Sequence, residues 1–475
     1  MDGHLIDMAY RAVRHAESMQ DVTYCDARAE ERDGTSIRVE NGKVDHVKNT
    51  SHAGIGIRML LATRGTWRFV SISSPESWSD VRRAIDGTTA GGQMTGTGVR
   101  AGREGGMTAR ADAMAGTGTE GARRPVPGRA ILCSTRPLAA RVTYPVAKPP
   151  DQDAIMQLGT ECGRAISDSP RIANSVTAPR YDTVSKYFAS SEGADILQEH
   201  TDTTVSMIAT ATTDGTTRSM DATVGGRGGL EVLRSEDGTE AVARAAELAS
   251  RAAELSAAGA AGQMRNADIV MNPSFVALLV HEIMGHPSEA DRVMGTEMAW
   301  AGGAWWKGML GRTIASDRLN VFDDPTIPGS LGHYAYDDEG VKTARTVLVR
   351  DGVLSGHMQS RETAAAFGAS PTGNMRAAGY EFMPLIRMAC TCIEPGDHTR
   401  DEMIRGIKDG YAIYDMRIPS IDMRRYNWSI SCQYARRIIN GEEAEMVRDV
   451  VVSGTAPDLF NSISACGRDF AGVGA

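Results

Sequence analysis

Residues 35–49 read TSIRVENGKVDHVKN, and apolar and polar side chains alternate in them on both sides of an Asn41-Gly42 pair. Alternation with a period of two predicts strands that bury one face. An Asn-Gly pair between two such runs is the strongest short-range signal of a two-residue hairpin turn. This stretch therefore predicts an antiparallel hairpin.

The neighbouring residues extend the pattern. Residues 53–73, AGIGIRMLLATRGTWRFVSIS, predict two more strands that separate near Gly65. Residues 235–262 predict an alanine-rich helix. At the N-terminus, these apolar residues fall near one helical face: Leu5, Ile6, Met8, Ala9, Ala12, Val13 and Ala16.

We therefore expect an α+β protein in two parts. Residues 1–262 are predicted to form an N-terminal α/β domain with an antiparallel sheet. Residues 263–475, in which short β-like runs alternate with turn signals, are predicted to form a mostly β, barrel-like C-terminal domain.

Residues 87–130 differ in composition, since they are rich in Gly, Thr, Ala and Arg and nearly lack large apolar side chains. Such a segment cannot bury enough apolar surface to offset its loss of conformational entropy. We expect a disordered insertion or linker here, and a corrupted stretch of sequence is the alternative.

The bulk composition limits the class of protein. The chain has 475 residues, 41% of them hydrophobic, and a formal net charge of -9. This charge does not favour nucleic-acid binding, which requires a basic face. The seven cysteines are an odd number without a C-x-x-C pair, which argues against a disulfide framework. Because no apolar run is long enough to span a bilayer and the N-terminus does not resemble a signal peptide, we expect a cytoplasmic protein without membrane or nucleic-acid partners.

Residues 279–291, LVHEIMGHPSEAD, contain the candidate functional residues of the chain. Asn272-Pro273 predicts the start of a helix that reaches this motif. The spacing is H-E-x-x-x-H, and residues five apart on a regular helix point about 140° apart. His281 and His286 can therefore share one ion only if the helix bulges or stops between them. Gly285 predicts a left-handed helix end, and Pro287 disfavours the α region for His286.

Two interpretations of the motif stay open on spacing alone. Neutral imidazoles suit zinc, and Glu282 beside the first of them could deprotonate a water. Alternatively, the histidines simply favour the negative end of the helix dipole. A zinc site would need a third protein ligand, for which Glu289, Asp291 and the cysteines are candidates.

Other residues of the second half have plainer interpretations. His357 lies in a strand-like run and is expected to be a packed side chain. The tryptophans Trp300, Trp305 and Trp306 follow the motif and either line a substrate cleft or form a hydrophobic plug.

Several ordered stretches together resemble the TldD/PmbA family of zinc metalloproteases. HEIMGHPSEAD is similar to that family's H-E-x-x-G-H-x-x-E-x-D signature. The stretches YDDEG (336–340), GVLSGHMQSRETA, PTGNMRA (371–377) and MPLIRMACTCIEPGD follow in the family's order. The first half matches from RAEERDGTSIRVENGKV onward, and the likeness covers most of the chain except residues 87–130.

This resemblance implies that His281 and His286 bind zinc and that Glu282 is the general base that activates a zinc-bound water. The family's third ligand is a cysteine in a C-G-K-x-G-Q stretch near the C-terminus. Cys466, followed by Gly467 and Arg468, is the candidate here. ISACGRDF also resembles the segment that precedes the cysteine loop, and on that alignment the chain ends short of the ligand. Cys466 is then a small buried hydrophobic residue.

The resemblance further implies a zinc-dependent peptidase that hydrolyses unfolded or short peptides. It also implies a homodimer, or a heterodimer with a related TldD/PmbA-type subunit. The alternative is a non-catalytic subunit of such an assembly that has lost its third metal ligand.

Overall fold

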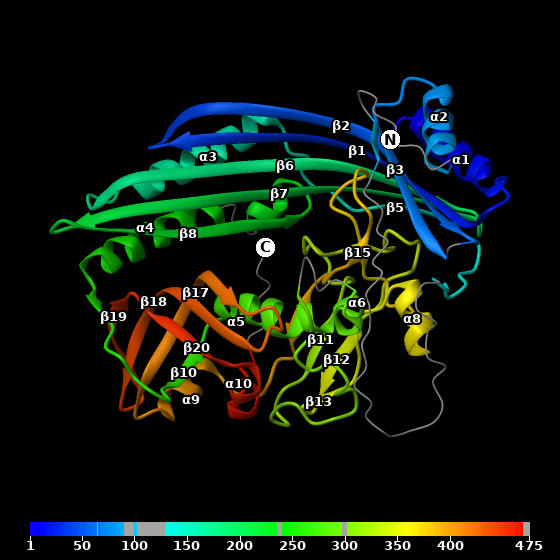
Figure 1. Ribbon diagram of the computed structural model, residues 1–475. Helices are drawn as coiled ribbons and strands as arrows, with labels where there is room; N and C mark the ends of the chain where they lie inside the picture. Colours follow the sequence, from blue (N-terminus) through cyan, green and yellow to red (C-terminus); the bar gives the residue numbers. More distant parts are fainter. Residues whose placement is uncertain (64, 90–98, 102–129, 235–239, 297–301, 469–475) are drawn as a thin grey trace.

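The computed structural model describes residues 1–63, 65–89, 99–101, 130–234, 240–296 and 302–468. The insertion predicted at residues 87–130 lies largely outside these ranges. The described residues form an α+β protein, as expected, with one long sheet across the upper part of Figure 1 and smaller sheets below it.

The long sheet has eight strands in the order β4-β3-β2-β1-β6-β7-β5, and β8 also pairs with β7. Neighbouring strands are antiparallel except β5 and β7, which pair in parallel. The strands are β1 (Val22–Glu40), β2 (Lys43–Leu61), β3 (Thr66–Ser73), β4 (Val99–Ala101), β5 (Leu138–Thr143), β6 (Ile172–Ser190), β7 (Ala194–Thr213) and β8 (Thr216–Arg227).

The hairpin predicted from Asn41-Gly42 is confirmed. Glu40 pairs with Lys43, and the two residues between them have φ of 50° and 71°. Two positive φ angles in sequence match the twist of the flanking strands, and Asn and Gly adopt them most readily. Asn440-Gly441 makes the same kind of turn later in the chain.

A unit of one helix followed by a long hairpin occurs twice in the first half. Helix α1 (Gly3–Glu17) leads into β1 and β2, and α3 (Gln152–Ser167) leads into β6 and β7. The two units meet where β1 and β6 pair, and Asp33 faces Thr183 at equivalent positions of these strands. The structure therefore contains an internal repetition that the sequence reading did not detect.

Helices cover the sheet near its two ends (Figure 1). The predicted face of α1 packs with α2 (Trp78–Thr89) on β1, β2 and β3, and of the seven predicted side chains only Ile6 is partly exposed. The alanine-rich α4 (Glu240–Ala257) packs with α3 on β7 and β8. The 3-10 helix η1 (Leu230–Leu233) precedes it.

The described residues of the second half form three smaller sheets. One has the order β10-β17-β18-β19-β9, with β20 beside β18; another has the order β13-β12-β11-β16; and β14 pairs with β15. The strands are β9 (Gly259–Ala260), β10 (Asp268–Met271), β11 (Val321–Asp323), β12 (Thr346–Arg350), β13 (Val353–Leu354), β14 (Met375–Arg376), β15 (Leu385–Ile386), β16 (Thr391–Ile393), β17 (Asp409–Ile421), β18 (Asn427–Ile439), β19 (Glu442–Arg448) and β20 (Val451–Thr455).

The expected barrel-like closure of the second half is wrong for the described residues. The largest of these sheets ends at β10 on one side and at β9 on the other, so it is open. Gly259–Ala260 already belongs to this sheet. The domain division at residue 262 stays a prediction.

The second half has its own apolar core, which contains Phe275, Leu279 and Ile283 from the motif region together with residues of the surrounding sheets. Within the described residues, no helix is both long and apolar enough to cross a membrane. The helical segments are α5 (Pro273–Val280), a π-helical turn η2 (His281–Gly285), a 3-10 turn η3 (His286–Ser288), α6 (Ala290–Met294), α8 (Arg361–Phe367), α9 (Arg400–Arg405) and α10 (Ala456–Ser462).

Candidate metal centre

Helix α5 begins at the predicted cap and leads directly into the motif. The Asn272 side-chain oxygen accepts a hydrogen bond from the Phe275 backbone N–H at 3.0 Å, and Pro273 follows in the first turn. The same Asn272 side chain donates to Asp415 on β17 at 2.9 Å. Because Phe275 and Leu279 are buried in the core, the start of the helix is fixed against the sheet.

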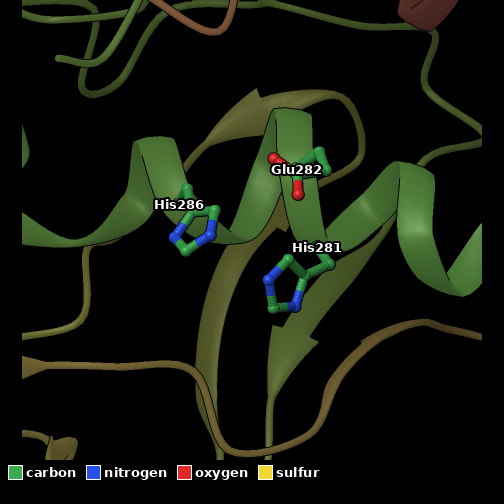
Figure 2. A group of neighbouring side chains, drawn as sticks. All are labelled: His281, Glu282 and His286. Carbon is green, nitrogen blue, oxygen red and sulfur yellow. The ribbon is translucent and has the colours of Figure 1, made fainter. Parts of the chain in front are cut away.

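The helix bulges between the two histidines. Residues His281–Gly285 form a π-helical turn, in which the His286 backbone N–H donates to the His281 carbonyl five residues earlier. This wider turn brings residues five apart to the same side of the helix. The two imidazole rings consequently lie edge to face with their centres 4.6 Å apart (Figure 2).

Gly285 does not end the helix in a left-handed conformation as predicted. Its φ and ψ are −63° and −59°, which are right-handed values open to any residue. A close approach favours glycine here instead, because a Cβ atom would stand 1.8 Å from the sulfur of the Met388 side chain, which would have to shift. The left-handed residue comes later, at Gly295 after α6, with φ of 89°.

Two tryptophans support the irregular helix. In a regular helix the Ile283 carbonyl would accept from residue 287, but Pro287 has no N–H. Trp305 Nε1 donates to the Ile283 carbonyl at 3.4 Å, and Trp306 Nε1 donates to the Pro287 carbonyl at 2.7 Å. Trp306 is fully buried, so it acts as the plug that was one of the two expectations. Trp300 lies outside the described residues.

Glu289 contacts the second histidine. Both of its carboxylate oxygens lie 3.2 Å from His286 Nδ1, and the carboxylate is completely buried. Burial raises the pKa of Glu289 to about 7, while Arg292 and Arg387 act in the opposite direction. When Glu289 is ionised, it accepts a hydrogen bond from Nδ1–H of His286, and the lone pair of Nε2 stays available to a metal ion. This is the usual orienting contact of metal-binding histidines.

Both imidazoles are kept neutral by their surroundings. Burial, followed by the charge of Arg292, lowers the pKa of His286 to about 2. Desolvation by neighbouring groups also lowers the pKa of His281, whose side chain stays exposed to solvent, against the opposite effect of Glu282. Neutral histidine is the form that binds metal, so this environment suits ligation at neutral pH.

The carboxylate of Glu282 has a cationic partner from a distant part of the chain. Arg425 Nη1 donates to Glu282 Oε2, and the two side chains are 17% and 14% exposed. Arg425 lies in the turn between β17 and β18.

In the part of the chain that the structure describes, one set of three side chains has the spacing of a metal site. The potential ligand atoms of His281, Glu282 and His286 all lie within 4.8 Å of one another (Figure 2). Two ligand atoms of a tetrahedral zinc ion stand roughly 3.3 Å apart, so the spacing of this set is near that of a zinc site. Two neutral imidazoles with a neighbouring carboxylate fit zinc.

The predicted third ligands do not join this set. The Cys466 thiol donates to the Arg318 carbonyl at 3.6 Å and stands against Gly396, and the half-buried thiol has a pKa that desolvation raises. Glu289 contacts His286 rather than the space between the rings. Asp291 accepts the backbone N–H of Arg292. Ligation by Cys466 therefore stays a prediction that the geometry does not support.

Sequence reasoning missed Arg425, and it named Glu289 as a candidate metal ligand rather than as the partner of His286. Glu289 follows His286 by three positions, which on a helix places the two side chains side by side, so its orienting contact could have been inferred. Arg425 is 143 positions from Glu282. No local spacing relates these two residues, and only the fold brings them together.

Comparison with known proteins agrees with the geometry. Three domain families match: PmbA/TldA metallopeptidase domain 1 over residues 25–90, the central domain over residues 144–255, and the C-terminal domain over residues 264–474. A metalloprotease of Methanothermobacter thermautotrophicus is 31% identical over 450 residues, which cover 94% of this chain and 89% of the relative. The chain belongs to the PmbA/TldA metallopeptidase family.

Other relatives of this PmbA/TldA chain agree in name and fold. A protein of Saccharolobus solfataricus named zinc metalloprotease TldD homolog is 32% identical over 204 residues, 42% of this chain and 44% of the relative. A solved Thermotoga maritima structure covers 98% of this chain and 95% of its own at a TM-score of 0.74 and 17% identity. TldE from Thermococcus kodakarensis covers 97% of this chain and 94% of its own at a TM-score of 0.68 and 16% identity. These two structures share the fold.

Proposed function

We propose that this protein is a zinc-dependent metallopeptidase that hydrolyses unfolded or short peptides. The observation that carries the proposal is the π-helical turn, which places His281 and His286 on one side of the helix with Glu282 beside them. A relative named zinc metalloprotease supports the choice of metal.

In this proposal His281 and His286 hold the cation. Desolvation favours the neutral form of both rings, and Glu289 fixes the orientation of His286. When bound, zinc would lower the pKa of a water molecule and polarise the peptide carbonyl.

Glu282 is the proposed general base. Its carboxylate lies beside both rings, accepts a proton from the attacking water and returns it to the leaving amine. General acid–base groups in enzymes contribute about 10²- to 10⁴-fold to rate. This role requires that the carboxylate be held within hydrogen-bond reach of the reacting atoms.

The direct test measures metal and activity together. We expect purified protein to carry about one zinc per chain and to cleave a flexible fluorogenic peptide, as one site of this type implies. Glu282→Gln should keep the zinc and lose at least about 100-fold in kcat, because it removes only the proton acceptor. His281→Ala should lose both the zinc and the activity. Full activity of Glu282→Gln would refute the proposal.

The same experiment distinguishes the alternative of a non-catalytic subunit, which would show no turnover in any zinc-loaded preparation.

For assembly, we propose a homodimer or a heterodimer with a related TldD/PmbA-type subunit. The shared fold of TldE supports the second option. Light scattering of the protein alone and mixed with such a subunit tests both.

A further inference from the structure

The contact between Arg425 and Glu282 joins two elements that are remote in sequence. Glu282 lies on the π-helical turn, and Arg425 comes from the turn that connects β17 and β18. Both side chains are mostly buried at this contact. The partner of the proposed general base is therefore a guanidinium with restricted access to solvent.

The turn that carries Arg425 is built around one carboxylate. Asp422 accepts hydrogen bonds from the backbone N–H groups of Arg424, Tyr426 and Asn427, at 3.0, 2.9 and 2.9 Å. It also accepts one from the Asn427 side chain at 2.7 Å. The Arg425 backbone N–H donates to the Asp422 carbonyl at 3.0 Å. These bonds fix the backbone on both sides of Arg425.

Neighbouring segments hold the same turn from outside. The Met423 carbonyl accepts from the Gly303 N–H at 2.7 Å, and the Tyr426 carbonyl accepts from the Ala456 N–H at 2.8 Å. The Tyr426 ring lies edge to face with Trp305, whose indole also donates to the Ile283 carbonyl in the π-helical turn. The turn and the motif helix are thus tied together through Trp305.

The position of Arg425 is energetically unfavourable in two respects. Its φ is 62°, in the left-handed region where glycine or asparagine would be less strained. A positive side chain beside a cation site also opposes cation binding by like-charge repulsion. Backbone strain of this kind persists where the surrounding structure enforces it, which is common at functional sites.

We propose that Arg425 is a positioning residue for Glu282, an inference that rests on the proposed peptidase function. Its guanidinium engages Oε2 of Glu282, which fixes the rotation of the carboxylate. The proton from water then goes to the remaining lone pairs, chiefly those of Oε1. The rigid turn around Asp422 ensures that the guanidinium is already in place before substrate arrives.

The test compares Arg425→Ala with Arg425→Lys and with the matched control Arg424→Ala. Arg424 is the exposed neighbour in the same turn and has no contact with Glu282 among the described interactions. Zinc content, zinc affinity by chelator competition, kcat and KM are measured for each variant. The first two readouts do not depend on turnover.

We expect Arg425→Ala to keep its zinc with unweakened affinity, since the change removes a like charge. Its kcat should fall about 10- to 100-fold while KM changes less than about 2-fold, because general-base catalysis is impaired and substrate binding is not. Arg425→Lys should retain an intermediate kcat, and Arg424→Ala should match the unmodified protein. Added guanidinium ion should partly restore Arg425→Ala and leave Glu282→Gln inactive.

Three results would overturn the inference. An unchanged kcat in Arg425→Ala would show that the contact is dispensable. A raised KM at constant kcat would show that Arg425 binds the substrate instead. An increased kcat would show that Arg425 inhibits Glu282. If Glu282→Gln is itself fully active, the peptidase proposal fails as well; if only Arg425→Ala is unaffected, the positioning role alone fails.

Discussion

His286 Nδ1 lies 3.2 Å from each carboxylate oxygen of Glu289, a side chain with no exposure to solvent. Arg292 and Arg387 form ion pairs with Oε2 of the same carboxylate. Two guanidiniums, one carboxylate and one imidazole thus form a continuous chain that ends at the proposed metal-binding nitrogen. The orientation of His286 depends on this chain.

Glu289→Gln should therefore weaken zinc binding. An amide does not attract the Nδ1 proton as a carboxylate does, so the ring is held less firmly and its Nε2 is a weaker ligand. Removal of such an outer partner typically costs about 10- to 100-fold in metal affinity. Chelator competition measures the change. Affinity equal to that of the unmodified protein would show that Glu289 serves only the fold.

Gly285→Ala should destabilise the second half. The new methyl group would overlap the Met388 sulfur, and overpacking of this kind costs about 1 to 3 kcal/mol. Urea unfolding measures the loss. As a control, Gly285→Ala should cost less in a Met388→Ala background than in the unmodified protein, because the overlapping atoms are then absent; if the two changes are additive, the close approach is not the cause.

Cys466→Ser should leave zinc content and affinity within about 2-fold of the unmodified protein, because a residue outside the first ligand shell does not supply a metal bond. The thiol contacts the Arg318 carbonyl and not the histidine pair. Metal analysis of the purified variant checks this. Loss of the zinc would instead identify Cys466 as the third ligand and would require the C-terminal segment to change its position.

His357 should make stability depend on pH. The side chain is buried, and desolvation lowers its pKa to about 4, as expected for the packed residue predicted from sequence. Since the unfolded chain has a histidine pKa near 6.5, it binds the proton first, and stability is lost as pH falls from about 6.5 towards 4. The full effect is roughly 3 kcal/mol.

Urea unfolding at several pH values tests this dependence. His357→Leu should flatten the loss of stability between about pH 6.5 and 4. The exposed His46 supplies the matched control, and His46→Gln should keep the slope of the unmodified protein. Identical slopes in all three proteins would contradict the assignment.

Local sequence predicted those features whose causes are local. The Asn41-Gly42 turn requires only two residues with positive φ, and the buried face of α1 requires only helical spacing. The H-E-x-x-x-H spacing likewise implied a bulge or an end of the helix, and the structure contains the bulge.

Features that depend on chain segments from elsewhere could not be predicted. Gly285 lies close to Met388, which is 103 positions away and leaves no trace in the local pattern. Arg425 approaches Glu282 only because β17 and β18 pair beside α5. The barrel-like expectation was wrong for the same reason, since strand-rich sequence does not specify how the outer strands end.

The π-helical turn is equivalent to one additional residue inserted in an α-helix. Removing Met284 alone would still leave the two histidines on one side, now four positions apart in an ordinary helix. Because His286 then faces the same way as before, the helix that follows keeps its direction relative to the two rings. The loss would fall on the core instead, because the deletion removes the buried side chain of Met284, so the inserted residue contributes to packing as well as to the spacing of the rings.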